Sequence, residues 1–309
     1  RSMASTAAWR GALVSRRGWL AGCAGARRAL CGRAGRMGNA VTFLGAGAAG
    51  GTLGGLVGLG GGAIMVPLMT RFAGMSQHAA VGTSSAAVAM TGLCGWASFS
   101  SAGAVDLPAA FAVAATAMFG ARFGAKLTSR YSSVQLGRIF AYYQLAVAPL
   151  VPLKSYIVRR KKEAEGGAAG GDGREGADQL ERGGGGRARE LALLSVMGVT
   201  AGVASGLFGI GGGMVVTPGL CLLTDLPYAT VLGTTLASMI PPSLVSAFTH
   251  SQMGNLALAA ALPLSIGSGI GAFGGGQIAV RVPEEPLQVF FTVFLAWMGA
   301  SKLRSLHDK

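Results

Sequence analysis

The chain has 309 residues, of which 51% are hydrophobic and only 12% are charged, and its net charge is +14. A soluble helical core could not hide so much apolar surface, and the basic residues lack the interleaved aromatic residues of a nucleic-acid groove. Asp225 is the single charged residue between Glu190 and Arg281, and the apolar runs there exceed the roughly 18 residues that a membrane-spanning helix needs. The composition therefore favours an all-α integral membrane protein.

Residues 1–38 form a basic N-terminal extension without an acidic residue. Arginines spaced among Ser and Ala are typical of an organelle transit peptide, and a disordered basic tail is the alternative. The first interpretation predicts an organelle membrane, such as the mitochondrial or plastid inner membrane. The second leaves the plasma membrane open.

Eight membrane spans are predicted after this extension, at 40–70, 79–101, 107–127, 134–153, 191–224, 228–250, 256–279 and 286–303. They form two four-helix units, 39–153 and 191–305. Asp106, followed by Pro108, marks the start of the third span, since an acidic residue and a first-turn proline favour a helix N-terminus. The segment between the units, 154–190, is charged and rich in glycine, which predicts a flexible hydrophilic linker outside the membrane.

An internal repeat relates the two units at an offset of 151 positions, from Gly55 to Gly206. The same offset relates GLVGLGGG (55–62) to GLFGIGGG (206–213), Pro67 to Pro218, and Gly82-Thr83 to Gly233-Thr234. Two homologous halves are the usual construction of secondary transporters. If every span crosses fully, the repeats are parallel. If the glycine-rich first element of each unit is re-entrant, they are inverted, and the sequence leaves both arrangements open.

The glycine clusters predict that the first helix of each unit is broken at membrane depth. Each glycine costs about 1 kcal/mol in helix propensity relative to alanine, and we assign Pro67 and Pro218 as further helix-breaking residues because proline removes a helix hydrogen bond. Broken backbone at membrane depth must be buried in protein or line a wet cavity, and its free N–H groups can bind an anion. Close helix packing is the alternative, and we favour it for the isolated Gly120 and Gly124.

Hydroxyl groups follow each glycine cluster in the first turns of the next helix, at Thr83, Ser84, Thr234 and Thr235. They could donate to an oxyanion, or bond back to the carbonyls of their own helix. His78 and His250 lie near span ends, and we interpret both as interfacial polar residues rather than proton carriers. No acidic residue lies deep in a predicted span, which argues against a carboxylate proton relay.

The doubled motif G-x-G-G-G-x(4)-P, each copy followed by G-T-[ST], resembles the sulfite exporter family of the TauE/SafE type over roughly residues 40–303. The resemblance implies a permease for small anions such as sulfite, sulfonates and sulfoacetate. It also implies a substrate site built from both units, with the residues Gly60, Gly61, Gly62, Thr83, Ser84, Gly211, Gly212, Gly213, Thr234 and Thr235.

We therefore expect a secondary transporter for a small anion: sulfite, a sulfonate or a related organic anion. A non-transporting membrane scaffold is the main alternative. A membrane-embedded enzyme is less favoured, because the predicted spans contain no HExxH, no paired carboxylates and no Ser/His/Asp grouping. No catalytic residue, metal or cofactor is expected. The expected partners are a small anionic solute and the lipid bilayer, not nucleic acid. The sequence leaves open whether the chain forms a homo-oligomer.

Overall fold

The computed structural model describes residues 38–132, 185–224 and 226–307, with a few scattered residues between 134 and 145. The described residues form α-helices joined by short turns, and no strand occurs among them. Three predicted regions lie wholly or largely outside the described residues: the N-terminal extension 1–38, the span 134–153 and the linker 154–190.

The helices follow the predicted spans, with one correction: α9 begins at Gly185, so residues 185–190, which were predicted to belong to the flexible linker, are helical. The first unit contains α2 (Gly38–Val57), α3 (Gly62–Phe72), α4 (Gln77–Ser101) and α5 (Leu107–Thr128), and the second contains α9 (Gly185–Phe208), α10 (Gly213–Leu223), α11 (Tyr228–Gln252), α12 (Leu258–Arg281) and α13 (Glu284–His307). The predicted spans 40–70 and 191–224 are each divided into two helices at the glycine cluster. Helix α5 begins as predicted, because Asp106 accepts a hydrogen bond from the Ala109 N–H through its Oδ1, at 3.1 Å.

Helices α2 and α3 form a hairpin, in which α3 returns along α2 towards the end where α2 began. The Gly61 backbone lies against Gly54, and Met69 lines the same hollow as Thr42 and Phe43. Helices α9 and α10 form a second hairpin.

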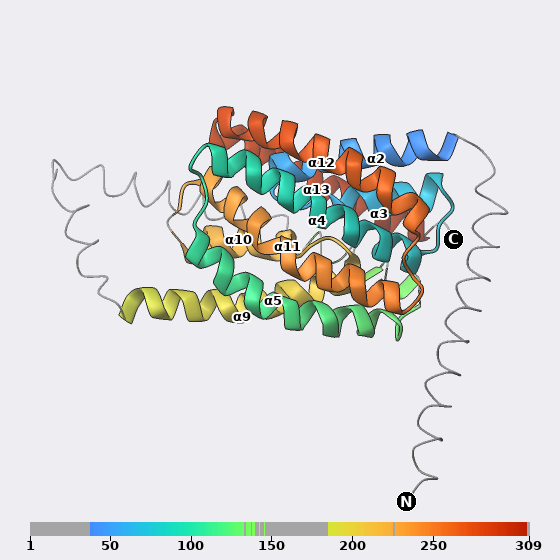
Figure 1. The fold of residues 1–309 in the computed structure, drawn as a ribbon, viewed down its shortest axis with the longest axis horizontal. Coiled ribbons are helices and arrows are strands. Elements are labelled where there is room, and N and C mark those ends of the chain that lie inside the picture. Colours follow the sequence, from blue (N-terminus) through green and yellow to red (C-terminus); the bar gives the residue numbers. More distant parts are fainter. Residues whose placement is uncertain are drawn as a thin grey trace, which may run out of the picture.

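In that second hairpin, α10 runs back along α9, as α3 does along α2. Gly212 lies against Ala201, and Gly219 lies against Met197. Figure 1 shows that α2 begins at the right-hand end of the bundle and α9 at the left-hand end. The two hairpins therefore enter the bundle from opposite ends.

The helices are arranged in layers, with α4 and α11 in the middle, α2 and α12 on one side, and α5 and α9 on the other (Figure 1). Glycines make the close contacts in the outer layers. A Cβ on Gly120 would strike the backbone of Val199, and one on Gly124 would strike that of Val203. The packing role that the sequence predicts for these two glycines is confirmed, since small residues let helix backbones approach closely.

The distribution of polar and apolar side chains is that of a protein in lipid. Large apolar side chains face outward, such as Phe111 and Phe119 on α5, which are 71% and 79% exposed. Hydroxyl side chains are buried in the interior, among them Thr91 and Ser268. Within the described residues, five helices are long and apolar enough to cross a membrane: Ala40–Val57, Leu107–Thr128, Leu191–Phe208, Tyr228–Gln252 and Leu258–Arg281. The chain is a multi-pass integral membrane protein.

Candidate functional site

The glycine clusters form two turns whose backbone only glycine adopts easily. In the first turn Gly58, Gly60 and Gly61 have φ angles of 70°, 74° and 72°, and in the second Gly209, Gly211 and Gly212 have 67°, 78° and 80°. A side chain in this left-handed region would clash with the carbonyl of its own residue. Gly61 and Gly212 are the N-caps of α3 and α10, and no side chain caps either helix. The sequence therefore dictates both the position and the shape of the two turns.

The prediction that Pro67 and Pro218 help to break their helices is wrong. Pro67 and Pro218 are inside α3 and α10, and each helix continues through its proline for several residues. The helix break that the sequence analysis assigned partly to them lies at the glycines alone. The physical reason is that a proline removes one helix hydrogen bond, but its fixed φ of about −65° is a helical value, so a helix can continue through it.

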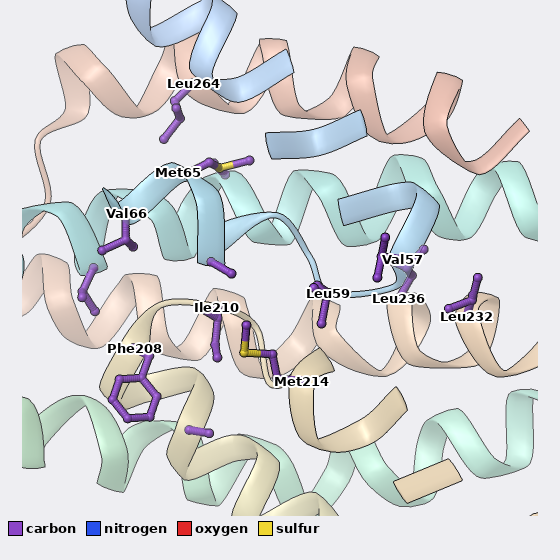
Figure 2. Close-up of a cluster of buried hydrophobic side chains, with 14 of the residues drawn as sticks. Val57, Leu59, Met65, Val66, Phe208, Ile210, Met214, Leu232, Leu236 and Leu264 are labelled. Carbon is purple, nitrogen blue, oxygen red and sulfur yellow. The ribbon is translucent and has the colours of Figure 1, made fainter. Parts of the chain in front are cut away.

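The two turns meet in the centre of the bundle. Gly62 lies against the backbone of Gly209 and Ile210, and Gly213 lies against the backbone of Gly58 and Leu59. Figure 2 shows side chains of the two turns, Leu59 and Ile210, in one buried cluster. The predicted glycine residues of both halves, Gly60, Gly61, Gly62, Gly211, Gly212 and Gly213, are thus brought together and all are buried.

Val88 of α4 and Met239 of α11 lie between the turns. A Cβ on either Gly60 or Gly211 would strike both side chains. Val88 is fully buried and Met239 is 1% exposed. Sequence reasoning missed both residues, although the repeat offset of 151 relates them. They make the centre of the site apolar and closed.

Three of the neighbouring hydroxyls also lie at the turns. The Ser84 hydroxyl is 3.0 Å from the carbonyl oxygen of Gly209, in the turn of the opposite half. The Thr217 hydroxyl is 3.4 Å from the carbonyl oxygen of Gly58 and 3.4 Å from the Thr235 hydroxyl. Ser84 and Thr235 are therefore close to the turns, as predicted, and Thr217 is an addition that the sequence analysis did not single out.

Thr83 and Thr234 point to helix starts of the opposite half. The Thr83 hydroxyl accepts a hydrogen bond from the N–H of Ala257, the N-cap of α12, at 3.2 Å. The Thr234 hydroxyl accepts one from the N–H of Asp106, the N-cap of α5, at 2.9 Å. These bonds tie each half to the other. The hydrogen of each hydroxyl group can still be donated, so a solute contact by these two threonines stays a prediction.

The interfacial interpretation is wrong for His250. Its side chain is fully buried, and its Nε2 lies 3.0 Å from the carbonyl oxygen of Gly206. The turn that follows α11 brings Asn255 and His250 against Gly82 of α4, and this packing removes the ring from the surface. His78, at the start of α4, is partly exposed, as expected for a residue near a span end.

A hollow of about 230 Å³ lies away from the turns, between the beginning of α2 and the end of α3. Its lining is apolar and includes Phe43, Leu68 and Phe72, which suits an acyl chain better than an anion. Among the described residues no group of His, Cys, Asp and Glu side chains could hold a metal ion.

The chemical character of the centre comes from the backbone. Two helix N-termini converge there, and each carries unpaired N–H groups and a partial positive charge of roughly half an elementary charge. The Thr235 hydroxyl, which accepts a hydrogen bond from Thr217, adds a donor within the same region, whereas the Ser84 hydroxyl already donates to the carbonyl oxygens of Val81 and Gly209. Such donors can bind the oxygen atoms of a small anion without a charged side chain.

Comparison with known proteins gives consistent results. The sequence model of one protein family, described as "Sulfite exporter TauE/SafE", matches residues 3–150 and 156–308. A probable membrane transporter protein of Bacillus subtilis, YdhB, is 26% identical over 78% of this chain and 92% of its own length. YunE of the same organism, also named as a probable membrane transporter, is 22% identical over 81% of this chain and 92% of its own length. No solved structure matches the chain significantly.

Proposed function

Because the chain belongs to the sulfite exporter TauE/SafE family of membrane transporters, we propose that it is a secondary transporter for a small anion. The substrate class is sulfite, a sulfonate or a related organic anion. The observation that carries this proposal is the meeting of two glycine turns, one from each half, at the centre of the bundle. Transporters built from repeats bind their solutes at such a meeting point, where broken helices present their N-termini.

The repeat supports this function through the directions of the hairpins. Helices α3 and α4 begin at Gly62 and Gln77, and α10 and α11 begin at Gly213 and Tyr228, at the same offset of 151 positions. The hairpins of the two halves enter from opposite ends (Figure 1). We infer two inverted repeats of four elements each, in which the glycine-broken first element is a re-entrant hairpin and the other three elements cross the membrane.

The proposed substrate site consists of residues from both repeats: Gly60, Gly61, Gly62, Thr83 and Ser84 from the first, and Gly211, Gly212, Gly213, Thr234 and Thr235 from the second. Among the described residues, the acidic residue linked to this site is Asp106, whose backbone N–H bonds to the Thr234 hydroxyl while its carboxylate accepts a hydrogen bond from the Ala109 N–H at the start of α5. The partial positive charge of two helix N-termini favours an anion over a cation.

Closure of the centre fits a transporter that exposes its site to one side at a time. Val88 and Met239 fill the space between the turns, so a solute reaches the N–H groups only when a hairpin moves away from these side chains. Movement of one repeat against the other around a fixed site is how inverted repeats provide alternating access.

Solute flux in sealed vesicles tests this function. Purified protein in proteoliposomes should take up labelled sulfite or methanesulfonate faster than protein-free liposomes do, and a bulky organic cation should not enter. A scaffold protein would give no flux of any of these solutes. Absence of anion uptake by protein that elutes as a single species would contradict the proposal.

A further inference from the structure

A row of polar side chains runs from the glycine turns to one end of the bundle. Ser243, Ser246 and His250 follow Met239 along α11 at spacings of four, three and four residues, which places them on one helix face. Each of the three polar side chains is fully buried. We call Ser85, Ser243, Ser246 and His250 the serine–histidine track.

The contacts of the track connect α11 with α4 and α9. The hydroxyls of Ser246 and Ser85 are 3.0 Å apart, so one donates to the other. Ser243 lies beside the second turn, since a Cβ on Gly211 would be 3.2 Å from its Oγ. The carbonyl oxygen of Gly206 accepts a hydrogen bond from His250 Nε2. The track thus begins at the proposed substrate site and ends near Gln252, at the end of α11.

Two atoms of the track lack a partner within the described part of the chain. The Ser243 Oγ and the His250 Nδ1 are buried and make no hydrogen bond there. Buried polar atoms are almost always paired, and a bound water or ion is one of the explanations for an unpaired one. Because a carbonyl can only accept, Nε2 carries the ring proton and Nδ1 of the neutral ring is an acceptor. It suits water. The Ser85 hydroxyl donates to the Val81 carbonyl oxygen and the Ser246 hydroxyl pairs with Ser85, so the Ser243 hydroxyl is the one left to donate to water or to an anion.

The repeat supplies an internal comparison for the track. At the positions 151 residues away, Gly92 corresponds to Ser243, Gly95 to Ser246, Phe99 to His250 and Leu236 to Ser85. The hydrogen-bonded pair Ser85–Ser246 is therefore replaced by Leu236 packed on Gly95. Phe99 and Leu236 are fully buried. The four corresponding positions thus carry apolar side chains or none, and the buried Ser98 hydroxyl lies with Phe99 against Gly276.

We propose that the serine–histidine track is a hydrated path for a small oxyanion between the glycine turns and the end of the bundle where α11 ends. On the other side, Leu236 and Phe99 form an apolar seal at the same depth. Bare anions do not enter an apolar path, whereas hydroxyls replace part of the water that an anion loses. This inference rests on the proposed transport function, and it assigns different roles to two positions that the repeat makes equivalent.

The chain offers a matched pair of positions for a test, Ser85 and Leu236. Cys23, Cys31, Cys94 and Cys221 are first replaced by alanine, and the variant Ser85→Cys or Leu236→Cys is then placed in lipid nanodiscs, where both membrane faces are accessible. The rate of modification by an anionic methanethiosulfonate is measured for each. Both residues are buried to the same degree, so burial in this conformation does not distinguish them.

We expect Ser85→Cys to react about tenfold faster than Leu236→Cys, because a thiol among apolar side chains stays protonated and unreactive. An excess of methanesulfonate should slow the modification of Ser85→Cys and leave that of Leu236→Cys unchanged. Ser246→Cys should behave like Ser85→Cys, and it serves as the second variant if the first does not elute as a single species.

Equal rates at the two positions, or a faster reaction of Leu236→Cys, would overturn the track. So would the absence of any reaction at both Ser85→Cys and Ser246→Cys. The measurement is independent of flux. Fast, sulfonate-protected labelling without uptake in proteoliposomes would contradict the transport function and keep the anion path. Uptake of the anion together with equal labelling rates at Ser85→Cys and Leu236→Cys would support the transport function and contradict the anion path.

Discussion

Val88 and Met239 contact the same two glycines, Gly60 and Gly211, although the four residues come from four different segments of the chain. Their positions in α4 and α11 are related by the repeat offset of 151. The Val88 side chain is short and branched, whereas the Met239 side chain is long. Met239 is therefore the larger obstacle between the turns, and its length should limit which anions pass.

The variant Met239→Ala should admit larger anions. Removing the side chain leaves space between Gly60 and Gly211, at a cost in stability of about 2–5 kcal/mol. The ratio of uptake of a longer alkyl sulfonate to that of methanesulfonate should rise relative to the unmodified protein. Met239→Leu, which nearly conserves volume, is the control and should leave the ratio close to its original value. An unchanged ratio in folded Met239→Ala would show that Met239 does not limit solute size.

Replacing a turn glycine should abolish transport. Gly212 has a φ of 80°, a conformation that costs a residue with a side chain roughly 1–2 kcal/mol, and a Cβ there would meet the Ala201 backbone. Gly212→Leu, and likewise Gly61→Leu, should therefore lose anion flux. Gly274→Leu is the matched control, because nothing lies within 4 Å of a Cβ at that position. Flux equal to that of the unmodified protein, from turn variants that elute as single species, would remove the glycines from the site and leave them only a packing role.

Removal of the Thr83 hydroxyl should lower stability. Thr83→Val leaves the N–H of Ala257 without its acceptor, which costs about 1–3 kcal/mol for a buried group. Thermal unfolding in detergent should show this loss, and Thr83→Ser, which keeps the hydroxyl, should restore most of it. The predicted contact with the anion is measured separately. If it exists, apparent affinity in the folded fraction weakens by about 1 kcal/mol, and an unaltered affinity would leave Thr83 as a tie between the halves alone.

Close packing between α5 and α9 should tolerate no side chain at Gly202. A Cβ there would strike the backbone of Ala117, so Gly202→Val should separate the two helices and cost about 1–3 kcal/mol or more. The yield of protein that elutes as a single species should fall. Gly45→Val on α2 is the control, because its Cβ would have nothing within 4 Å. Equal yields of the two variants would contradict the packing role of the glycines on α9.

The linker should be the first site of proteolysis. Residues 164–187 show no apolar periodicity, and stretches of small and polar residues are preferred sites of nicking. Residues 185–187 lie in α9, so the cuts are expected before Gly185. Limited proteolysis followed by mass spectrometry should locate the first cuts there, while the two halves stay associated on a sizing column. First cuts outside 154–190 would contradict the prediction of a tether.

Local features of the fold could be predicted because they depend on neighbouring residues. The apolar runs define the helices, Asp106 begins α5, and consecutive glycines end α2 at Val57 and α9 at Phe208. The glycine positions of the site follow from the same reasoning, since only glycine adopts the observed φ angles easily. The effect of Pro67 was overestimated, because the φ of a proline is compatible with a helix and α3 continues through it with one hydrogen bond fewer.

What lies opposite each side chain could not be predicted in this way. The sequence alone determined that each half contains a glycine turn, and that hydroxyls follow it. Only the tertiary structure decided that the hairpins enter from opposite ends, that Thr83 bonds to Ala257, and that Ser246 faces Ser85 while the equivalent Gly95 faces Leu236. The physical reason is that backbone breaks follow from the propensity of a few adjacent residues, whereas these contacts join segments 125 or more residues apart, as Ser84 and Gly209 are. Such contacts depend on the direction in which whole helices pack.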